Sequence, residues 1–313
     1  MTIELDGLYF PEALRWHDGA LWFSDMFDSR VIRWVPGQAA ETVIDRDSGC
    51  PEMPGGLGWL PAEVDQNGDG ALLVVDCLGK RILAVRNGQV GVHAELGGHF
   101  SFPANDMHVD PDGTAWVGGY GFDPMTGTPE ASPFLCVGRD GSVHSTSAQF
   151  VFPNGCERDA AGGLVVAETF ADRISVLDAS SIEPWNSEHE AEPSTLVTFK
   201  SGSGPDGLSI APDGIIYVAL AFARQLVAVD RHDAGTRTGD ATGSASVRQA
   251  PAVRVVYTPE PIASGPAAGP LACYDCAVEP DGRRIAVAVA SANEELAERV
   301  ATGRIVLLDL PPQ

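Results

Sequence analysis

The stretch NDMHVDPDGTAWV at residues 105–117 contains a short apolar strand, a D-G turn and a second strand. The same pattern returns as NGCERDAAGGLVV (154–166), DGLSIAPDGIIYV (206–218) and YDCAVEPDGRRIAV (274–287). Each copy reaches its turn glycine eight residues after its first residue. A hairpin unit that recurs at long spacing is typical of a β-propeller, in which similar sheets repeat around an axis.

Two less regular copies bring the number of units to six. PEALRWHDGALWF (11–23) is one residue shorter, and GGLGWLP (55–61) followed by ALLVVDC (71–77) has a longer turn. Radial repetition would aim the leading residue of every unit at the common axis. Four of these six leading residues carry a side-chain oxygen suited to binding a cation; the six positions, here called the column, are Glu12, Gly55, Asn105, Asn154, Asp206 and Tyr274.

These units predict an all-β, six-bladed propeller that occupies residues 1–313 as a single domain. The chain ends in RIVLLDL (304–310) with no further strand for its blade, so we expect TIELDGLYF (2–10) to supply that strand and close the ring. Closure removes the exposed edges of an open sheet. Only ANEELAERVA (292–301) has a helical pattern.

The long insertions are expected to be loops within blades and not linkers between domains. They span residues 180–195, 231–252 and 259–270, and are rich in Ser, Gly, Pro, Thr and Asp.

Composition excludes several classes of partner. The formal net charge of −23 argues against a nucleic-acid partner, because such proteins need clustered Lys and Arg. No stretch approaches the roughly 18 apolar residues of a membrane helix, and the first residues lack a basic segment followed by an apolar run. We therefore expect no membrane partner and a cytoplasmic location.

Two motifs resemble metal sites but have simpler interpretations. Cys273 and Cys276 form the only C-x-x-C pair, and with no second pair nearby the six cysteines are predicted to be buried free thiols. DQNGDGALLVVD (65–76) fits a calcium-loop pattern. However, Asp76 would end a strand that cannot curl back to offer the twelfth ligand, so an acidic turn is the preferred interpretation over a second metal site.

The column predicts a metal site. In each hairpin the column residue pairs with the end of the second strand, so the loops that follow the second strands share its mouth. Carboxylate and amide oxygens suit Ca²⁺, whereas zinc sites favour His and Cys. The alternative is that these Asn and Asp residues are only turn formers bonded to their own backbone.

Aromatic residues in the neighbouring loops are predicted to rim this mouth and contact a small apolar ligand. The rim residues are Phe27, Tyr120, Phe122, Phe170 and Phe222, and Glu168 is expected close to Asn154.

The sequence resembles the senescence-marker-protein/gluconolactonase family, which includes regucalcin, over almost its whole length. The resemblance is carried by FPEALRW (10–16), FPANDMHVDPDGTAWVGGYGFD (102–123), FPNGCERDAAGGLVVAET (152–169) and GPDGLSIAPDG (204–214). It implies a six-bladed propeller with one divalent metal in its channel, most simply Ca²⁺, with Zn²⁺, Mg²⁺ and Mn²⁺ open.

The resemblance also assigns residues. It implies that Glu12, Asn154 and Asp206 bind the metal, and that Asn105 binds substrate or also touches the metal. It implies a lactone or ester hydrolase in which Asp206 accepts the proton of the attacking water. His108 is the rival base. Phosphotriester hydrolysis on the same metal and a non-catalytic ligand-binding propeller are the alternatives.

The arginine that binds sugar lactones in regucalcin has no clear counterpart near Phe102 and Pro103. Together with the aromatic rim, this predicts a substrate less polar than an aldonolactone.

Overall fold

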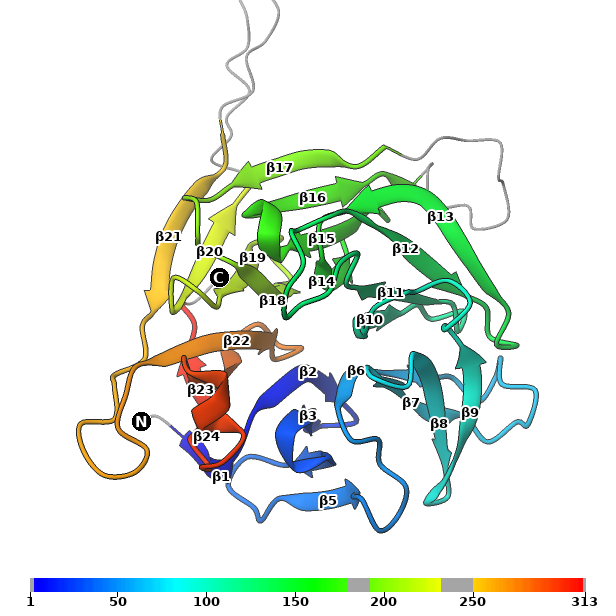
Figure 1. The fold of residues 1–313 in the computed structure, drawn as a ribbon, viewed down its shortest axis with the longest axis horizontal. Helices are drawn as coiled ribbons and strands as arrows, with labels where there is room; N and C mark the ends of the chain where they lie inside the picture. Colours follow the sequence, from blue (N-terminus) through cyan, green and yellow to red (C-terminus); the bar gives the residue numbers. More distant parts are fainter. Residues whose placement is uncertain (1–2, 180–191, 232–249, 312–313) are drawn as a thin grey trace, which may run out of the picture.

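The computed structural model describes residues 3–179, 192–231 and 250–311, which form six four-stranded antiparallel sheets. Figure 1 shows these sheets arranged around a common axis, with one strand of each sheet nearest the centre. This arrangement is the six-bladed propeller that the repeats predict. The inner strands are β2 (Pro11–His17), β6 (Pro54–Leu60), β10 (Ala104–Val109), β14 (Pro153–Arg158), β18 (Pro205–Ile210) and β22 (Leu271–Val278).

The remaining strands follow outward in each blade. The second strands are β3 (Ala20–Asp25), β7 (Ala71–Asp76), β11 (Ala115–Gly119), β15 (Leu164–Glu168), β19 (Ile216–Leu220) and β23 (Arg284–Ser291). The third strands are β4 (Arg30–Trp34), β8 (Arg81–Arg86), β12 (Ser132–Val137), β16 (Arg173–Leu177), β20 (Gln225–Asp230) and β24 (Gly303–Asp309). The outer strands are β5 (Glu41–Ile44), β9 (Gln89–Glu95), β13 (Val143–Phe150), β17 (Ser194–Thr198), β21 (Ala252–Tyr257) and β1 (Ile3–Leu8).

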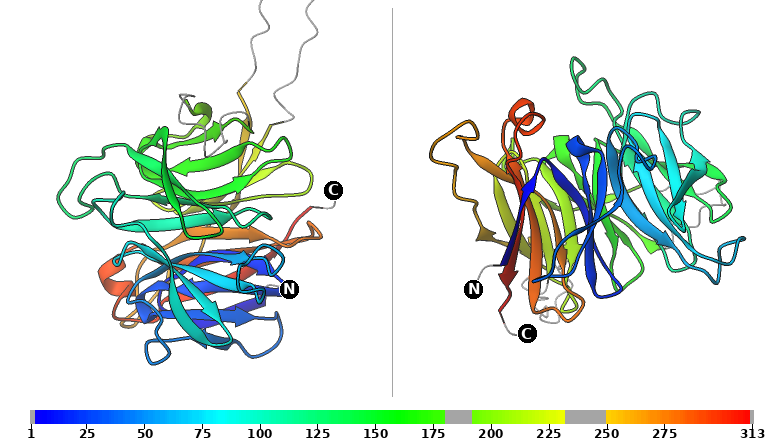
Figure 2. Two further views of the ribbon diagram at one scale, coloured as in Figure 1. Left: turned by 90° about the vertical axis from the view of Figure 1, so that its right-hand side faces the viewer. Right: turned by 90° about the horizontal axis from the view of Figure 1, so that it is seen from below.

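The N-terminal strand closes the ring, as predicted. β1 pairs antiparallel with β24, with Ile3 opposite Leu307 and Leu5 opposite Ile305. The sixth sheet therefore contains the first and the last strand, and its order is β1, β24, β23 and β22 (Figures 1 and 2).

The core lies between neighbouring blades and explains the apolar runs of the second strands. Every residue of β7, β11, β15 and β19 is buried. A strand covered on both faces has no reason to alternate between apolar and polar side chains. The runs ALLVV (71–75) and LVVA (164–167) follow from this position.

The predicted helix is much shorter than its sequence pattern. Residues 292–301 were expected to be helical, whereas α1 spans only Glu294–Ala297, capped by Oδ1 of Asn293, which accepts a bond from the backbone N–H of Leu296. Ala297 is the one fully buried residue of this turn. A short helix depends on burying an apolar face, and this segment offers too little to continue before β24 begins.

Two of the expected loops, 180–195 and 231–252, fall mostly outside the described residues. The third, 259–270, contains one isolated bridge between Ile262 and Gly269 and no named strand. None of the helices in the described part of the chain has the length and apolar character needed to span a bilayer.

The six cysteines are buried and form no disulfide, as expected. The acidic segment 65–76 also follows its simpler interpretation. Asp65 accepts two bonds from Arg86, at 3.1 and 3.0 Å. Asp76 ends β7 and accepts a bond of 2.8 Å from Nε of Arg81. Both carboxylates therefore pair with arginines, and a turn before β7 contains Asp65, as the acidic-turn interpretation predicts.

Glycines allow the inner strands to approach one another closely. A Cβ atom on Gly207 of β18 would lie 1.7 Å from Oδ1 and 2.6 Å from Cα of Asp275 on β22. A Cβ on Gly155 of β14 would lie 2.7 Å from Cα of Gly207. Because these neighbours include backbone atoms, a side chain at either position would push two blades apart.

We predict that Gly207→Ala lowers the free energy of unfolding by more than about 3 kcal/mol, since overpacking against backbone cannot be relieved by a rotamer change. Gly97→Ala is the matched control, because nothing lies within 4 Å of its added Cβ, and it should change stability by less than about 0.5 kcal/mol. Urea unfolding measures both variants. Equal stability of the two variants would contradict the close approach.

Candidate functional site

The column residues lie where each inner strand changes register against its neighbour. The irregularities fall between Glu12 and Arg15, Pro54 and Leu57, Ala104 and Met107, Pro153 and Cys156, Pro205 and Leu208, and Cys273 and Asp275. A β-bulge bends a strand and redirects its side chains, and bulges occur often beside active sites. Thus all six inner strands have irregular pairing at the position that repeats in the sequence.

Three of the four polar column residues are in direct contact. Nδ2 of Asn105 donates to Oδ1 of Asn154 at 2.9 Å. Nδ2 of Asn154 donates to Oδ1 of Asp206 and, at 3.3 Å, to Oγ1 of Thr169. Contacts between different blades cannot come from Asx turns, so these residues are more than turn formers. The convergence predicted from the repeat is present.

Carboxylates at or just after the ends of second strands accept hydrogen bonds from the loops that lead into the column residues. Asp25 pairs with Arg30 at 2.7 Å and accepts the N–H groups of Tyr9 and Phe10, just before Glu12. The same arrangement recurs in the fourth blade, where a glutamate replaces the aspartate.

That glutamate is Glu168, which pairs with Arg173 at 2.6 Å and accepts the N–H of Val151, just before Asn154. Asp172 accepts the N–H groups of residues 202–204, immediately before Asp206. Glu168 is therefore tied to its arginine and positions the loop, while its neighbour Thr169 contacts Asn154.

Negative charge dominates the channel. Burial is the main cause that raises the pKa of Glu12 well above its usual value, and the negative charge of Asp206 is the second cause. Burial, and next the charges of Asp275 and Asp106, raise the pKa of Asp206 in the same way. Glu12 and Asp206 form no ion pair with any described residue. Both groups would be stabilised in their ionised forms by a cation between them.

Arg15 is the countercharge of two further carboxylates in the channel, Asp106 and Asp275. Nη2 of Arg15 lies 2.9 Å from Oδ1 of Asp106 and also donates to the carbonyl oxygen of Met107. Its Nη1 lies 3.7 Å from Oδ2 of Asp275. Asp275 also accepts the backbone N–H groups of Leu14 and Cys276. This cluster, which the sequence analysis missed, joins the first, third and sixth blades across the axis.

The donor set fits a hard divalent cation. Glu12, Asp206, Asn105 and Asn154 offer only oxygen ligands, as Ca²⁺ prefers. No group of three or more His, Cys, Asp or Glu residues in the described ranges is arranged as a metal site, so the amide oxygens are essential to this candidate. Asn154 donates Nδ2 to Asp206, and its Oδ1 would face a cation there only after the amide rotates.

Four of the five predicted rim residues form a row of touching rings, whereas Phe27 packs on Phe10 outside this row. Tyr120 and Phe122 lie 5.5 Å apart, Phe122 and Phe170 5.2 Å, and Phe170 and Phe222 5.8 Å. Phe170 and Phe222 are 37% and 50% exposed, whereas Phe122 is buried. Exposed surface for a ligand is therefore offered mainly by Phe170 and Phe222, and the buried ring of Phe122 packs edge-on against Phe170.

Two aromatic residues of this region, Phe10 and Phe152, were not predicted from the sequence. Phe152 stacks on Tyr120, with ring centroids 3.7 Å apart. Phe27 packs on Phe10 at 4.5 Å, and Phe10 packs on Tyr274 at 4.4 Å. Phe10 and Phe152 precede the prolines of two repeats, and this repeated F-P pair was the signal available in the sequence.

Electrostatics place these tyrosines near the column. Burial, followed by the charges of Glu294 and Asp206, raises the pKa of both Tyr120 and Tyr274 above their usual values. Glu294 on α1 thus belongs to the surroundings of the column, although its sequence position gave no sign of this.

His108 lies toward the other end of the channel. It is three residues beyond Asn105 along β10, roughly 10 Å at the usual rise of a strand. Its Nε2 lies 3.3 Å from Oδ1 of Asp110, and it lines a cavity that none of the column residues lines. The structure therefore does not bring His108 to the column.

Comparison with known proteins identifies the family. A family model described as SMP-30/Gluconolactonase/LRE-like region matches residues 10–245. The chain belongs to this family. No curated protein matches its sequence.

Solved structures share the fold of this gluconolactonase-family chain. A luciferin-regenerating enzyme is 16% identical with a TM-score of 0.68, over 98% of this chain and 94% of the other. A gluconolactonase from Xanthomonas campestris is 15% identical with a TM-score of 0.65, over 97% and 88%. A calcium-binding regucalcin from Agrobacterium tumefaciens is 15% identical with a TM-score of 0.65, over 97% and 91%. At such identities the likeness shows the fold alone.

We predict that Arg15→Met lowers the free energy of unfolding by about 3–5 kcal/mol at pH 8.5, because it leaves Asp106 and Asp275 buried without a countercharge. Burial raises the pKa of Asp275 to about 7, and Arg15 opposes that rise. Without Arg15 the pKa rises further. At pH 5.5 Asp275 is protonated in both proteins, so the loss should be smaller there than at pH 8.5.

Urea unfolding at the two pH values measures this difference. Arg283→Met is the control, because the side chain of Arg283 is 84% exposed and should contribute less than about 1 kcal/mol at either pH. A loss of stability for Arg15→Met that is independent of pH would show that Asp275 does not titrate as described.

Proposed function

We propose that this gluconolactonase-family protein is a metal-dependent hydrolase that opens a lactone or a related ester. The observation that carries the proposal is a pair of carboxylates without a cationic partner among the described residues: half-buried Glu12 and buried Asp206. The amides of Asn105 and Asn154 adjoin Asp206. Family membership supports the reaction class. A relative of the same fold is named a gluconolactonase, and another a calcium-binding protein.

Glu12, Asn154 and Asp206 would hold one divalent cation, most simply Ca²⁺, with Asn105 beside it. When bound, such a cation polarises a carbonyl oxygen and lowers the pKa of a water molecule. Because calcium acidifies water only weakly, a protein base is still needed. Asp206 has a suitable oxygen, since Oδ1 accepts from Asn154 and Oδ2 has no hydrogen bond to a described residue. Asp206 would take the proton of the attacking water.

The aromatic row next to the column would receive the body of the substrate. Phe170 and Phe222 offer exposed ring surface, and Tyr120 lies near the charge of Asp206. Apolar contact contributes about 25 cal/mol per Å² of buried surface. Aromatic or alkyl lactones and esters would therefore be preferred over polyhydroxylated lactones.

We predict that the protein hydrolyses lactones in the presence of Ca²⁺, that EDTA removes the activity, and that added Ca²⁺ restores it. Within a lactone panel, kcat/KM should be higher for dihydrocoumarin than for gluconolactone, because only the former buries an aromatic body against the rim. A preference for gluconolactone would show that polar groups line the pocket. Activity that survives complete removal of metal would refute the metal-dependent reaction.

We predict that Asp206→Asn lowers kcat by more than tenfold while the protein stays folded, since the amide cannot accept the proton. Calcium occupancy must be measured alongside by calorimetry, because Asp206 is also a proposed ligand. Asp112→Asn is the matched control. Asp112 is an exposed turn residue whose Oδ1 accepts the N–H of Thr114, a bond that asparagine can also accept, and kcat should be unchanged. Near-normal turnover in metal-loaded Asp206→Asn would assign the base elsewhere.

Phosphotriester hydrolysis on the same metal and ligand binding without catalysis remain the alternatives. Both are decided by the same assays. Turnover of paraoxon without turnover of any lactone would favour the former, and calcium binding without turnover of either class would favour the latter.

A further inference from the structure

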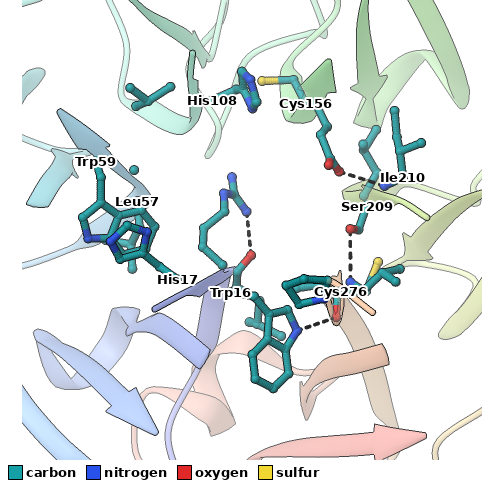
Figure 3. Close-up of a pocket in the computed structure, with 18 of the residues that line it drawn as sticks. Trp16, His17, Leu57, Trp59, His108, Cys156, Ser209, Ile210 and Cys276 are labelled. Atoms are coloured by element: carbon teal, nitrogen blue, oxygen red, sulfur yellow. Dashed lines mark hydrogen bonds between the residues drawn. The ribbon is translucent and has the colours of Figure 1, made fainter. Parts of the chain in front are cut away.

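The channel has a second opening at the end away from the column. A cavity of ≈ 480 Å³ lies there between the far halves of the inner strands and the turns that follow them. Figure 3 shows Trp59 and His17 on one side and Ser209 and Ile210 on the opposite side. None of the column residues lines this cavity, so it is separate from the candidate hydrolase site.

Aromatic rings with fixed orientations form part of the cavity wall. His17 and Trp59 are stacked, with ring centroids 3.9 Å apart (Figure 3). Trp22 packs edge-on against the ring of Trp59 at 5.6 Å. Nε1 of Trp16 donates to the carbonyl oxygen of Ala277 at 3.1 Å, which holds that indole in place. These contacts present apolar ring surface without the entropy loss of ordering it on binding.

The uncompensated charge in the cavity is that of Glu157. Its Oε2 accepts the backbone N–H of Ile210 at 2.7 Å, and the carboxylate forms no ion pair with any residue of the described ranges. Burial raises the pKa of Glu157, while His108 and Arg15 act against that rise from a distance. The half-buried carboxylate is therefore held by hydrogen bonds with Ile210 and Ser209 and has no direct countercharge.

The other charged groups of the cavity already have partners. Arg15 lies 2.9 Å from Asp106, and Asp110 is bound by Arg158. Glu279 pairs with Arg284 at 2.7 Å. An anionic ligand would meet Glu157 without a free cation to receive it. A cationic ligand would instead supply the partner that Glu157 lacks.

We propose that this cavity binds a small organic cation with an aromatic or alkyl body. The ammonium group would lie against the carboxylate of Glu157, and the body would pack on Trp16 and Trp59. A cation near indole faces is also attracted by their π electrons. The cavity volume is within the range of pockets that enclose small molecules.

Three probes of similar shape and different charge test the proposal: benzylammonium, benzyl alcohol and benzoate. Calorimetry at pH 7.5 with saturating Ca²⁺ should show 1:1 binding of benzylammonium and at least tenfold weaker binding of the other two. Quenching of tryptophan fluorescence should accompany binding, since Trp16 and Trp59 line the cavity. Absence of saturable benzylammonium binding, or equal binding of benzoate, would refute the proposal.

Two variants separate this cavity from the acidic column. Glu157→Gln should weaken benzylammonium binding at least tenfold, whereas Glu12→Gln at the other end of the channel should leave it unchanged. The opposite pattern would place the cation at the column and overturn the proposal. If Glu157→Gln does not fold, Trp59→Leu replaces it, and an affinity unaltered by loss of this ring would likewise refute the site.

Discussion

The charge of the channel is the constraint on which the rest of the site depends. Glu12, Asp106, Asp206 and Asp275 influence one another there, and Arg15 directly contacts two of them, Asp106 and Asp275. Removing carboxylates from water is unfavourable unless a countercharge or hydrogen bonds replace the solvent. Arg15 supplies the countercharge for Asp106 and Asp275. Glu12 and Asp206 have no such countercharge among the described residues, and this is the basis for the proposed cation.

This charge can be assembled only because the inner strands come so close. At Gly207 a single added carbon would collide with Asp275, and at Gly155 it would collide with the backbone of the next blade. The register change in each inner strand then redirects the column residues. Close packing and bending together bring amides and carboxylates of different blades into contact, as in the Asn105, Asn154 and Asp206 chain.

The sequence was sufficient to predict what repeats. The hairpin units, the column and the closure by residues 2–10 all follow from copies of one pattern, and the structure has each of them. Arg15 could not be predicted in this way, because no other copy has an arginine at its position. The length of α1 was also missed, since helical propensity at 292–301 does not reveal how little apolar surface the segment can bury.

The aromatic residues that the sequence predicted to form one rim differ in their exposure to solvent. Phe122, Phe170 and Phe222 all follow second strands, yet Phe122 is buried and the other two are exposed. The spacing along the chain places a residue in a loop but does not say whether its ring turns toward the blades or toward solvent. Contacts between rings from different blades decide this, and they involve Phe152, which lies outside the predicted rim.

The two ends of the channel contain different candidates for the general base of the proposed hydrolysis, Asp206 at the column and His108 at the opposite end. The Arg15 cluster crosses the axis between the column and the opposite cavity, and His108 belongs to the cavity side, beside Asp110. A base must reach the proton it removes directly or through one water. His108 is separated from Asn105 by about three residues of extended strand, roughly 10 Å, which is too far for either. In the proposed reaction, a water attacking at the column would therefore have the carboxylates of Asp206 and Glu12 as candidate proton acceptors, and Asp206 is the one held by Asn154.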